Sequence, residues 1–279
     1  MKRRNILSSR HVEELRKRRQ KRAGAKALVF LLVFGALFVG LGFASGWQRI
    51  NIQNLELSGN KVVETKGIED VIQSKLAGKY LWLFPKTNFL FYPKSRIKKA
   101  LSGNFLILKD IDLTLQDVNT LKITLTEREA KFTWCGEKLP EDSSAEKCYF
   151  MDENGYIYVE APYFSGDVYF KFFGRIGNNG DQPLGSYFFP ENFSGLVYFR
   201  EAAEKLDLRP SLIAVKDDGD AELYLGSQAN TPKIIFKLNA DIEKTTENLG
   251  LVLESEELKG KIGALKYIDL RFGNKVYFK

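Results

Sequence analysis

A run of twenty residues without a charged side chain, from Ala27 to Gly46, constrains this chain more than any other feature of its sequence. At about 1.5 Å rise per residue, a helix of this length spans about 30 Å, the thickness of the hydrocarbon core of a bilayer. Each central Leu, Phe and Val favours insertion by about 0.3–0.6 kcal/mol. Trp47 follows at once, where an amphipathic ring suits headgroup depth. The sequence therefore predicts a single transmembrane helix over residues 27–47.

The positive charge of the chain is concentrated before this run. Residues 1–26 contain eleven of the 42 Lys and Arg residues and two of the 35 acidic residues, which leaves a formal charge of −2 on residues 27–279. The positive-inside rule predicts a cytoplasmic tail over residues 1–26, an anchor in the inner (cytoplasmic) membrane and an extracytoplasmic C-terminal part. A cleaved signal peptide is the main alternative, but its apolar region is usually about 7–15 residues. A topology signal is favoured over binding of DNA or anionic lipid by the tail.

Residues 48–127 show strand and helix patterns in the order β-α-α-β-β. Strand spacing over residues 50–57 precedes helical spacing over 67–76 and, after Pro93, over 97–101. Apolar residues then alternate along 107–115 and 121–126. This order predicts a three-stranded sheet with two helices on one face. We expect its small core, rather than a contact surface, to take several of the aromatic residues between the helices: Tyr80, Trp82, Phe84, Phe89, Phe91 and Tyr92.

Residues 128–279 give mainly strand signals. Two helices, over 196–206 and 241–255, interrupt the strands, and residues 161–195 receive no assignment. The expected fold class is α+β, with one N-terminal transmembrane helix, the small β-α-α-β-β domain, and a mostly antiparallel β domain with two helices. The candidate strands cover residues 131–134, 147–151, 156–159, 211–215, 221–225, 233–238, 267–272 and 276–278.

The two cysteines, Cys135 and Cys148, flank a polar stretch that suits a hairpin loop. A disulfide between them would contribute on the order of 3 kcal/mol in the chain-entropy model, and an extracytoplasmic location permits it. Two reduced, half-buried thiols are an equally weighted alternative.

The part beyond the apolar run has few residues suited to catalysis. Because His11 is the only histidine, this part contains no Ser-His-Asp triad, Cys-His dyad or histidine zinc site. No nucleotide fingerprint occurs, and the acidic residues form no recognisable catalytic pair. We therefore expect no enzymatic activity, cofactor, metal, nucleic acid or small-molecule substrate.

Three features together resemble the FtsQ/DivIB family of bacterial cell-division proteins. The first is the layout: a basic tail, a single anchor, a unit with the element order of a polypeptide-transport-associated (POTRA) domain, and a β domain. The second is the segment Ile52–Asn60, similar to the start of that family's POTRA domain, with Thr126–Ala130 and Tyr149–Gly155 continuing the match. The third is the ending Tyr267–Phe272, similar to the family's terminal strand. The loop between Trp134 and Tyr149 is larger than the family pattern.

The resemblance implies a non-enzymatic scaffold of the divisome, enriched at the division septum. Such a scaffold binds small bitopic division proteins of the FtsB and FtsL types, contacts other divisome proteins and helps control septal peptidoglycan synthesis. The alternative is a membrane-anchored POTRA protein for secretion or outer-membrane assembly. Proteins of that kind normally continue into a barrel of many alternating strands, whereas residues 128–279 include helices and a charged, water-soluble pattern.

The last strand, Tyr267–Phe272, is the expected partner-binding site, with Tyr277 and Phe278 as aromatic anchors. A strand that ends the chain is expected at a sheet edge, where unpaired N–H and C=O groups accept a strand from a partner. Ile268, Leu270 and Phe272 are expected to pack on the sheet, and Arg271 to pair with a partner carboxylate. The alternative is that these residues only complete the core. The expected partner-binding residues are Tyr267, Asp269, Arg271, Phe272, Val276, Tyr277 and Phe278.

Overall fold

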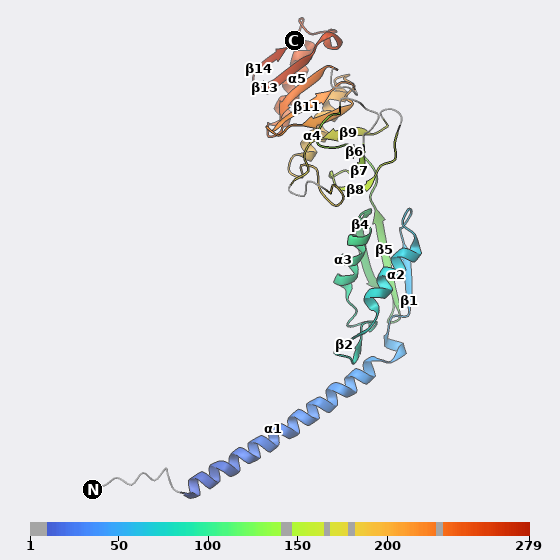
Figure 1. Cartoon of the computed structure of the whole chain (residues 1–279), viewed down its shortest axis with the longest axis vertical. Coiled ribbons are helices and arrows are strands. Elements are labelled where there is room, and N and C mark those ends of the chain that lie inside the picture. Colours follow the sequence, from blue (N-terminus) through green and yellow to red (C-terminus); the bar gives the residue numbers. More distant parts are fainter. Residues whose placement is uncertain (1–9, 141–146, 165–167, 178–181, 227–230) are drawn as a thin grey trace, which may run out of the picture. The chain divides into compact units, whose positions relative to one another are not determined.

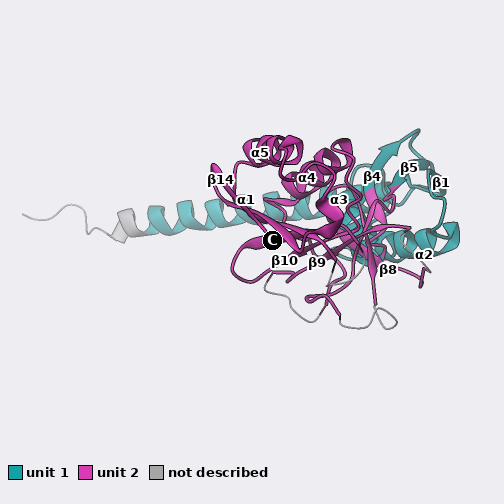
Figure 2. Ribbon diagram, turned by 90° about the horizontal axis from the view of Figure 1, so that it is seen from above, with its two compact units in different colours: residues 1–104, 110–126 teal, residues 105–109, 127–279 magenta. Residues whose placement is uncertain are grey.

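The computed structural model describes residues 10–140, 147–164, 168–177, 182–226 and 231–279 (Figure 1). The chain divides into two compact units, one of residues 1–104 and 110–126 and the other of residues 105–109 and 127–279 (Figure 2). The predicted α+β class is confirmed, because a long apolar N-terminal helix precedes a small sheet in the first unit and a nine-stranded sheet in the second.

The first unit begins with α1 (Arg10–Ser45), which extends from the basic tail through the charge-free run. Within the described residues, Glu14–Ser45 is the one helix that is long and apolar enough to cross a membrane. Side chains such as Leu31 and Phe34 are more than half exposed, an unusual state for large apolar residues of a helix in water. The helix therefore has the length and surface of a membrane segment.

A three-stranded sheet in the order β1-β5-β4 follows α1. β1 (Asn54–Ser58) pairs in parallel with β5 (Thr120–Glu127), and β4 (Leu108–Leu115) lies on the other side of β5. In β5, Leu121, Ile123 and Leu125 are buried while Lys122 and Thr124 are exposed, so one face of the sheet is covered. Two helices that contact each other, α2 (Thr65–Leu76) and α3 (Lys94–Asn104), supply the cover with five buried residues: Ile68, Ile72, Leu76, Ile97 and Leu101.

Between these helices lies a hairpin that the sequence pattern does not predict. β2 (Lys79–Tyr80) pairs antiparallel with β3 (Phe84–Pro85), and the tip residues Leu81 and Trp82 have left-handed backbone, with φ of 47° and 59°. None of the six aromatic residues between the helices is buried, and Trp82 is 90% exposed. Tyr80, Phe84, Phe89 and Tyr92 are half-buried, so the expectation that several of them fill the core holds only as partial burial, and the fully buried side chains of this unit are mainly aliphatic.

The second unit contains a mixed sheet in the order β14-β13-β12-β11-β10-β9-β6-β7-β8. Five of its eight strand pairs are antiparallel, and the pairs β13–β12, β10–β9 and β9–β6 are parallel. The strands are β6 (Phe132–Trp134), β7 (Tyr149–Met151), β8 (Ile157–Glu160), β9 (Phe170–Phe173), β10 (Leu212–Val215), β11 (Asp220–Tyr224), β12 (Lys233–Lys237), β13 (Tyr267–Phe272) and β14 (Lys275–Phe278).

Two helices, α4 (Phe193–Lys205) and α5 (Ile242–Glu254), contact each other and share one large apolar core with the sheet. Phe199 of α4 stacks on Phe236 of β12 with ring centroids 4.2 Å apart. Short 3₁₀ turns occur in both units, at η2 (Gln48–Ile50) in the first and at η4 (Ile262–Ala264) in the second. Ile213 of β10 and Ile268 of β13 also belong to the apolar core that the sheet shares with α4 and α5.

The other face of the large sheet carries a smaller apolar cluster, made of Cys135, Phe173, Leu212, Ala214 and Tyr224. Cys135 and Cys148 are joined by a disulfide, which is the oxidised of the two alternatives drawn from the sequence. The bond therefore links the residue that follows β6 to the residue that precedes β7, across a stretch partly outside the described residues.

A buried ion pair fixes the start of the second unit. Asp152 is fully buried and binds the guanidinium of Arg128, whose Nε also donates to the carbonyl oxygen of Leu106 at 3.1 Å. The other carboxylate oxygen accepts from the backbone N–H groups of Asn154 and Tyr156, at 2.9 and 3.0 Å. Two of the segments that carry the family resemblance thus meet in one structural contact.

Candidate functional site

The structure places the two C-terminal strands in different positions in the sheet. β13 lies between β12 and β14, while β14 is the outermost strand. The expectation that Tyr267–Phe272 forms the edge is therefore wrong. Gly273, with φ of 65°, lies in the turn that folds the chain back, so that Lys275–Phe278 covers the outer side of β13. The edge strand contains three of the expected partner-binding residues, namely Val276, Tyr277 and Phe278.

The backbone of β14 has one paired side and one open side. Lys279 and Tyr267 exchange two hydrogen bonds of 3.2 and 3.4 Å, and the register continues through the pairs Ile268–Phe278 and Asp269–Tyr277. Because hydrogen-bonded and non-hydrogen-bonded pairs alternate in an antiparallel ladder, Phe278 directs its N–H and C=O groups away from β13. Despite the register shift, Val276 lies between Tyr277 and Lys275, which pair with Asp269 and Phe272, so its N–H and C=O groups are also directed outward. Across the described ranges, no strand pairs with this outer side.

The side chains along the edge are largely aromatic and exposed. The exposed fractions of Phe272, Tyr277 and Phe278 are 55%, 52% and 41%. The rings of Phe272 and Tyr277 meet edge to face at 5.2 Å. Phe272 was expected to pack on the sheet, but a register shift between Asp269 and Phe272 changes its orientation and leaves it exposed.

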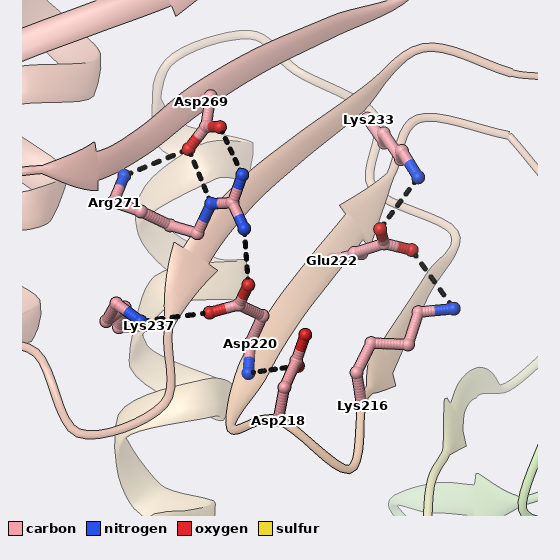
Figure 3. A network of polar contacts seen from close by, with 8 residues as sticks. All are labelled: Lys216, Asp218, Asp220, Glu222, Lys233, Lys237, Asp269 and Arg271. Atoms are coloured by element: carbon pink, nitrogen blue, oxygen red, sulfur yellow. Dashed lines mark hydrogen bonds and ion pairs between the residues drawn. The ribbon is translucent and has the colours of Figure 1, made fainter.

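Arg271 is held inside the unit rather than presented at the edge (Figure 3). Its guanidinium binds both carboxylate oxygens of Asp269, at 2.9 and 2.6 Å, and also bonds to Asp220 of β11. Lys237 of β12 lies 3.4 Å from the other oxygen of Asp220. Both carboxylates are nearly buried, at 5% exposed for Asp269 and 6% for Asp220. The Arg271 guanidinium, which was expected to bind a carboxylate of a partner, already binds two carboxylates of its own chain.

The protonation states in this cluster follow from its contacts. Burial alone would raise the pKa of Asp269, but hydrogen bonds from Arg271 and the charges of Arg271 and Lys237 outweigh it, so the pKa lies below its usual value. Hydrogen bonds to Asp269 and Asp220 raise the pKa of the Arg271 guanidinium. Asp269 and Arg271 therefore stay ionised at neutral pH.

A second ion cluster lies beside the first on the same strands. Glu222 of β11 binds Lys233 at 2.7 Å and Lys216 at 3.3 Å, and it accepts a 2.6 Å hydrogen bond from the hydroxyl of Tyr224. Burial alone would raise the pKa of Glu222. Hydrogen bonds from Lys233 and Tyr224 and the charges of Lys233 and Lys216 outweigh this effect, so the pKa lies below its usual value. Figure 3 shows the two clusters together, and we call them the charged ladder: Lys216, Asp220, Glu222, Lys233, Lys237, Asp269 and Arg271.

Sequence reasoning found Asp269 and Arg271 but missed the acidic residues of β11. A signal was present, because Asp220 and Glu222 alternate with apolar residues in a strand, and Lys233 and Lys237 have the matching same-face spacing in the next strand. Opposite charges at facing positions of antiparallel strands pair across the ladder, as Asp220 and Lys237 do. The charged ladder thus holds β11, β12 and β13 together behind the edge.

A hollow adjoins the charged ladder. A hollow of about 260 Å³ lies beside Arg271, lined by residues of β12, α5 and β13 that include Lys237, Lys244 and Asn248. The described part of the chain holds no group of three or more His, Cys, Asp or Glu residues placed to bind a metal. Comparison of the sequence with protein-family models found no match, and comparison with curated proteins found none either. The site thus combines the open side of β14, the exposed aromatic residues beside it and the charged ladder behind them.

Proposed function

We propose that this chain is a non-enzymatic scaffold of the FtsQ/DivIB type, anchored by α1 with its basic tail in the cytoplasm. Its extracytoplasmic sheet binds a strand of a small bitopic division protein of the FtsB type along β14. The observation that carries this proposal is the open outer side of β14, which leaves the N–H and C=O groups of Val276 and Phe278 available to a partner.

The two edges of the large sheet differ in a way that supports this choice. At the β8 edge, Ile157 donates to the carbonyl oxygen of Ser186 at 2.9 Å, and Gly185 donates to the carbonyl oxygen of Ile157 at 2.8 Å. A nearby segment therefore occupies backbone groups that a partner strand would need. Soluble proteins usually cover or charge such edges, so an edge that keeps exposed aromatic residues favours a binding role.

The edge side chains suit strand addition. A partner strand gains affinity from main-chain hydrogen bonds and specificity from alternate side chains. Phe278 and the pair Phe272–Tyr277 are exposed aromatic groups, the type enriched among residues that dominate binding energy. Asp269 and Arg271 contribute by holding β13 in register, so that the edge is rigid before the partner arrives.

The remaining features agree with a POTRA domain and a division role. The first unit contains the element order β1-α2-α3-β4-β5, with the β2–β3 hairpin as an addition. Such a unit is a docking module, which provides a place for further divisome proteins. Through partners of the FtsB and FtsL types, the scaffold would help control septal peptidoglycan synthesis at the division septum of the inner membrane.

Affinity isolation of the tagged full chain from native membranes tests the proposal, with two variants at one edge position. Val276→Pro removes an outward N–H and no bond to β13, whereas Val276→Ala shortens the same side chain and keeps the N–H. We expect small single-pass coiled-coil proteins to copurify with the natural chain and with Val276→Ala, and to be lost with Val276→Pro. Thermal unfolding of both variants shows whether the fold is kept.

Two outcomes would contradict the proposal. If Val276→Pro retains the coiled-coil partners, they bind elsewhere, and the β14 site is wrong. Recovery of secretion or outer-membrane assembly components in their place would favour the alternative function.

A further inference from the structure

A group of exposed apolar residues in the first unit lies beside the C-terminal half of α1. At the tip of the β2–β3 hairpin, Leu81 is 66% and Trp82 90% exposed, and the following turn exposes Leu90 and Phe91. The rings of Phe84 and Phe91 meet at 5.9 Å, so the hairpin and the turn are adjacent. We call Leu81, Trp82, Leu90 and Phe91 the apolar lobe.

The hairpin tip is built in an unusual way. Leu83 donates to the carbonyl oxygen of Tyr80 at 3.1 Å, and Leu81 and Trp82 occupy two consecutive left-handed positions between them. Asn and Gly normally fill such positions in a hairpin exposed to water. Large apolar residues at these positions are strained and unfavourably exposed to water, which indicates that they contact an apolar surface.

The hairpin packs directly on the apolar helix. The rings of Phe38 and Phe84 lie 5.2 Å apart, and Leu83 packs against Gly42, where an added Cβ would lie 2.9 Å from the Leu83 Cβ. The carbonyl oxygen of Ser45 at the helix end accepts hydrogen bonds of 3.0 Å from the side-chain amides of Asn51 and Asn88. Asn88 is 1% exposed, so this connection is buried and fixes the turn that carries the lobe.

These contacts set the depth of the lobe once α1 crosses a membrane, which is the part of the proposed function on which this inference rests. Phe38 lies eight residues before Gly46, which corresponds to about 12 Å along the helix axis. A hairpin that touches Phe38 must then reach below the outer boundary of the hydrocarbon. Sliding α1 outward would relieve this only by drawing Lys26 and Arg22 into the apolar layer, which their charges oppose.

The backbone and the flanking charges also suit this depth. The hairpin closes on itself through the β2–β3 pairs and a 3.1 Å hydrogen bond from Lys86 N–H to the carbonyl oxygen of Gly78, which satisfies polar groups that lipid cannot. Tyr80 shares a hollow with Lys94 and Arg96 at the start of α3. Basic residues around an aromatic tip match the boundary between anionic headgroups and acyl chains.

We propose that the apolar lobe inserts into the outer leaflet of the membrane beside α1, as a second membrane contact of the first unit. A single helix can rotate about its axis and tilt in the bilayer, and the first unit packed on it would move with it. A second contact fixes which face of the first unit is directed toward the membrane and which is available to partners.

Site-directed spin labelling of the full chain in phosphatidylcholine–phosphatidylglycerol vesicles, at high dilution in lipid, tests this proposal. A nitroxide is attached at Trp82→Cys in the lobe, at Leu32→Cys in α1 and at Val62→Cys, which is 74% exposed between β1 and α2. The two native cysteines are joined as a disulfide and do not take the label. The measurement is collision with lipid-soluble oxygen relative to a water-soluble nickel chelate. We expect oxygen to dominate at positions 32 and 82, and nickel to dominate at position 62.

A pair of glycine variants tests whether the contact with α1 sets the depth. Gly42→Leu displaces Leu83, whereas Gly40→Leu adds the same side chain where an added Cβ meets nothing within 4 Å. We expect Gly42→Leu to increase nickel access at position 82 several-fold and Gly40→Leu to leave it unchanged. Water exposure at position 82 with lipid exposure at position 32 would overturn the lobe while leaving the anchor. Water exposure at both positions would overturn the anchor, and the lobe with it.

Discussion

Replacing Arg271 with Met separates a structural role for this residue from a role in partner binding. Methionine keeps an unbranched side chain of similar reach but removes the charge and every donor. In the native chain the guanidinium makes two hydrogen bonds to Asp269 and one to Asp220. The variant therefore leaves two nearly buried carboxylates in close proximity, with Lys237 as the remaining cation.

The size of the effect follows from these contacts. A hydrogen bond to a charged group contributes about 1.5–3 kcal/mol, and removing one partner of a buried ion pair costs about 3–5 kcal/mol. The Arg271 side chain is 29% exposed, which lets water screen part of the loss, and Lys237 at 3.4 Å offsets another part for Asp220. We therefore expect a loss of about 3 kcal/mol in the free energy of unfolding. At about 2–4 °C per kcal/mol, the Tm should fall by about 6–12 °C.

Circular dichroism of the detergent-solubilised full chain at pH 7 measures this change. Lys237→Met is the matched control, because it removes one cation at 58% side-chain exposure and should cost less than about 1 kcal/mol. If Arg271→Met melted within about 2 °C of the natural chain, which corresponds to at most about 1 kcal/mol, yet lost its partner, Arg271 would serve binding, as the sequence suggested, and the reasoning from the ion cluster would be refuted.

Three further predictions concern stability. Asp269 and Glu222 have pKa values below the ordinary 3.8 and 4.5, so the stability they contribute is present above those values and is lost as the pH falls through the folded-state pKa. Asp269→Asn removes one of these groups, so its Tm should fall less between neutral and acid pH than the Tm of the control Glu56→Gln, which changes an exposed residue. Replacing Cys135 and Cys148 together with Ser should cost on the order of 3 kcal/mol, and dithiothreitol should lower the Tm of the natural chain but not of this variant. In Gly59→Ala the new Cβ would lie 2.0 Å from the Leu125 carbonyl oxygen, at a φ of 93°, so this variant should destabilise the first unit by more than about 1 kcal/mol. Gly103→Ala adds a Cβ in open space on α3 and should stabilise the unit slightly. Denaturant unfolding compares the two variants.

Periodic patterns predicted the elements that have one buried face. The alternation of Leu121, Ile123 and Leu125 located β5, and helical spacing located α2 and α5. β9 was missed because it has no such alternation. It lies in the middle of the sheet, between β6 and β10, and its neighbouring residues Phe172 and Phe173 are both fully buried, one on each face. A strand of four residues with both faces covered cannot be distinguished by periodicity from other short apolar runs.

The β2–β3 hairpin and the order of the last strands were missed for different reasons. Leu81 and Trp82 occupy the turn in which Asn-Gly would have been the signal, so local chemistry conceals the hairpin. Gly273-Asn274, in contrast, is a recognisable two-residue connection between Phe272 and Lys275, and it indicates that the chain folds back on β13. The pairing of Arg271 with Asp220 could not be predicted from the sequence, because α5 separates β12 from β13 and only the sheet order brings the two residues together.

Because β13 lies inside the sheet and β14 at its edge, the proposed function assigns stability to residues of β13 and partner binding to residues of β14. Arg271 joins β13 to β11 through Asp220, and Asp269 holds the Arg271 guanidinium, so substitutions at either residue should lower the Tm and disturb any binding edge that depends on β13. The outward backbone groups of Val276 and Phe278 make no bond to β13, so losing one of them should alter binding more than the Tm. Both sets of residues would therefore appear in a screen for lost partner binding. The Tm of each variant assigns it to one strand or the other, because only an outer-edge residue can lose the partner while the sheet remains intact.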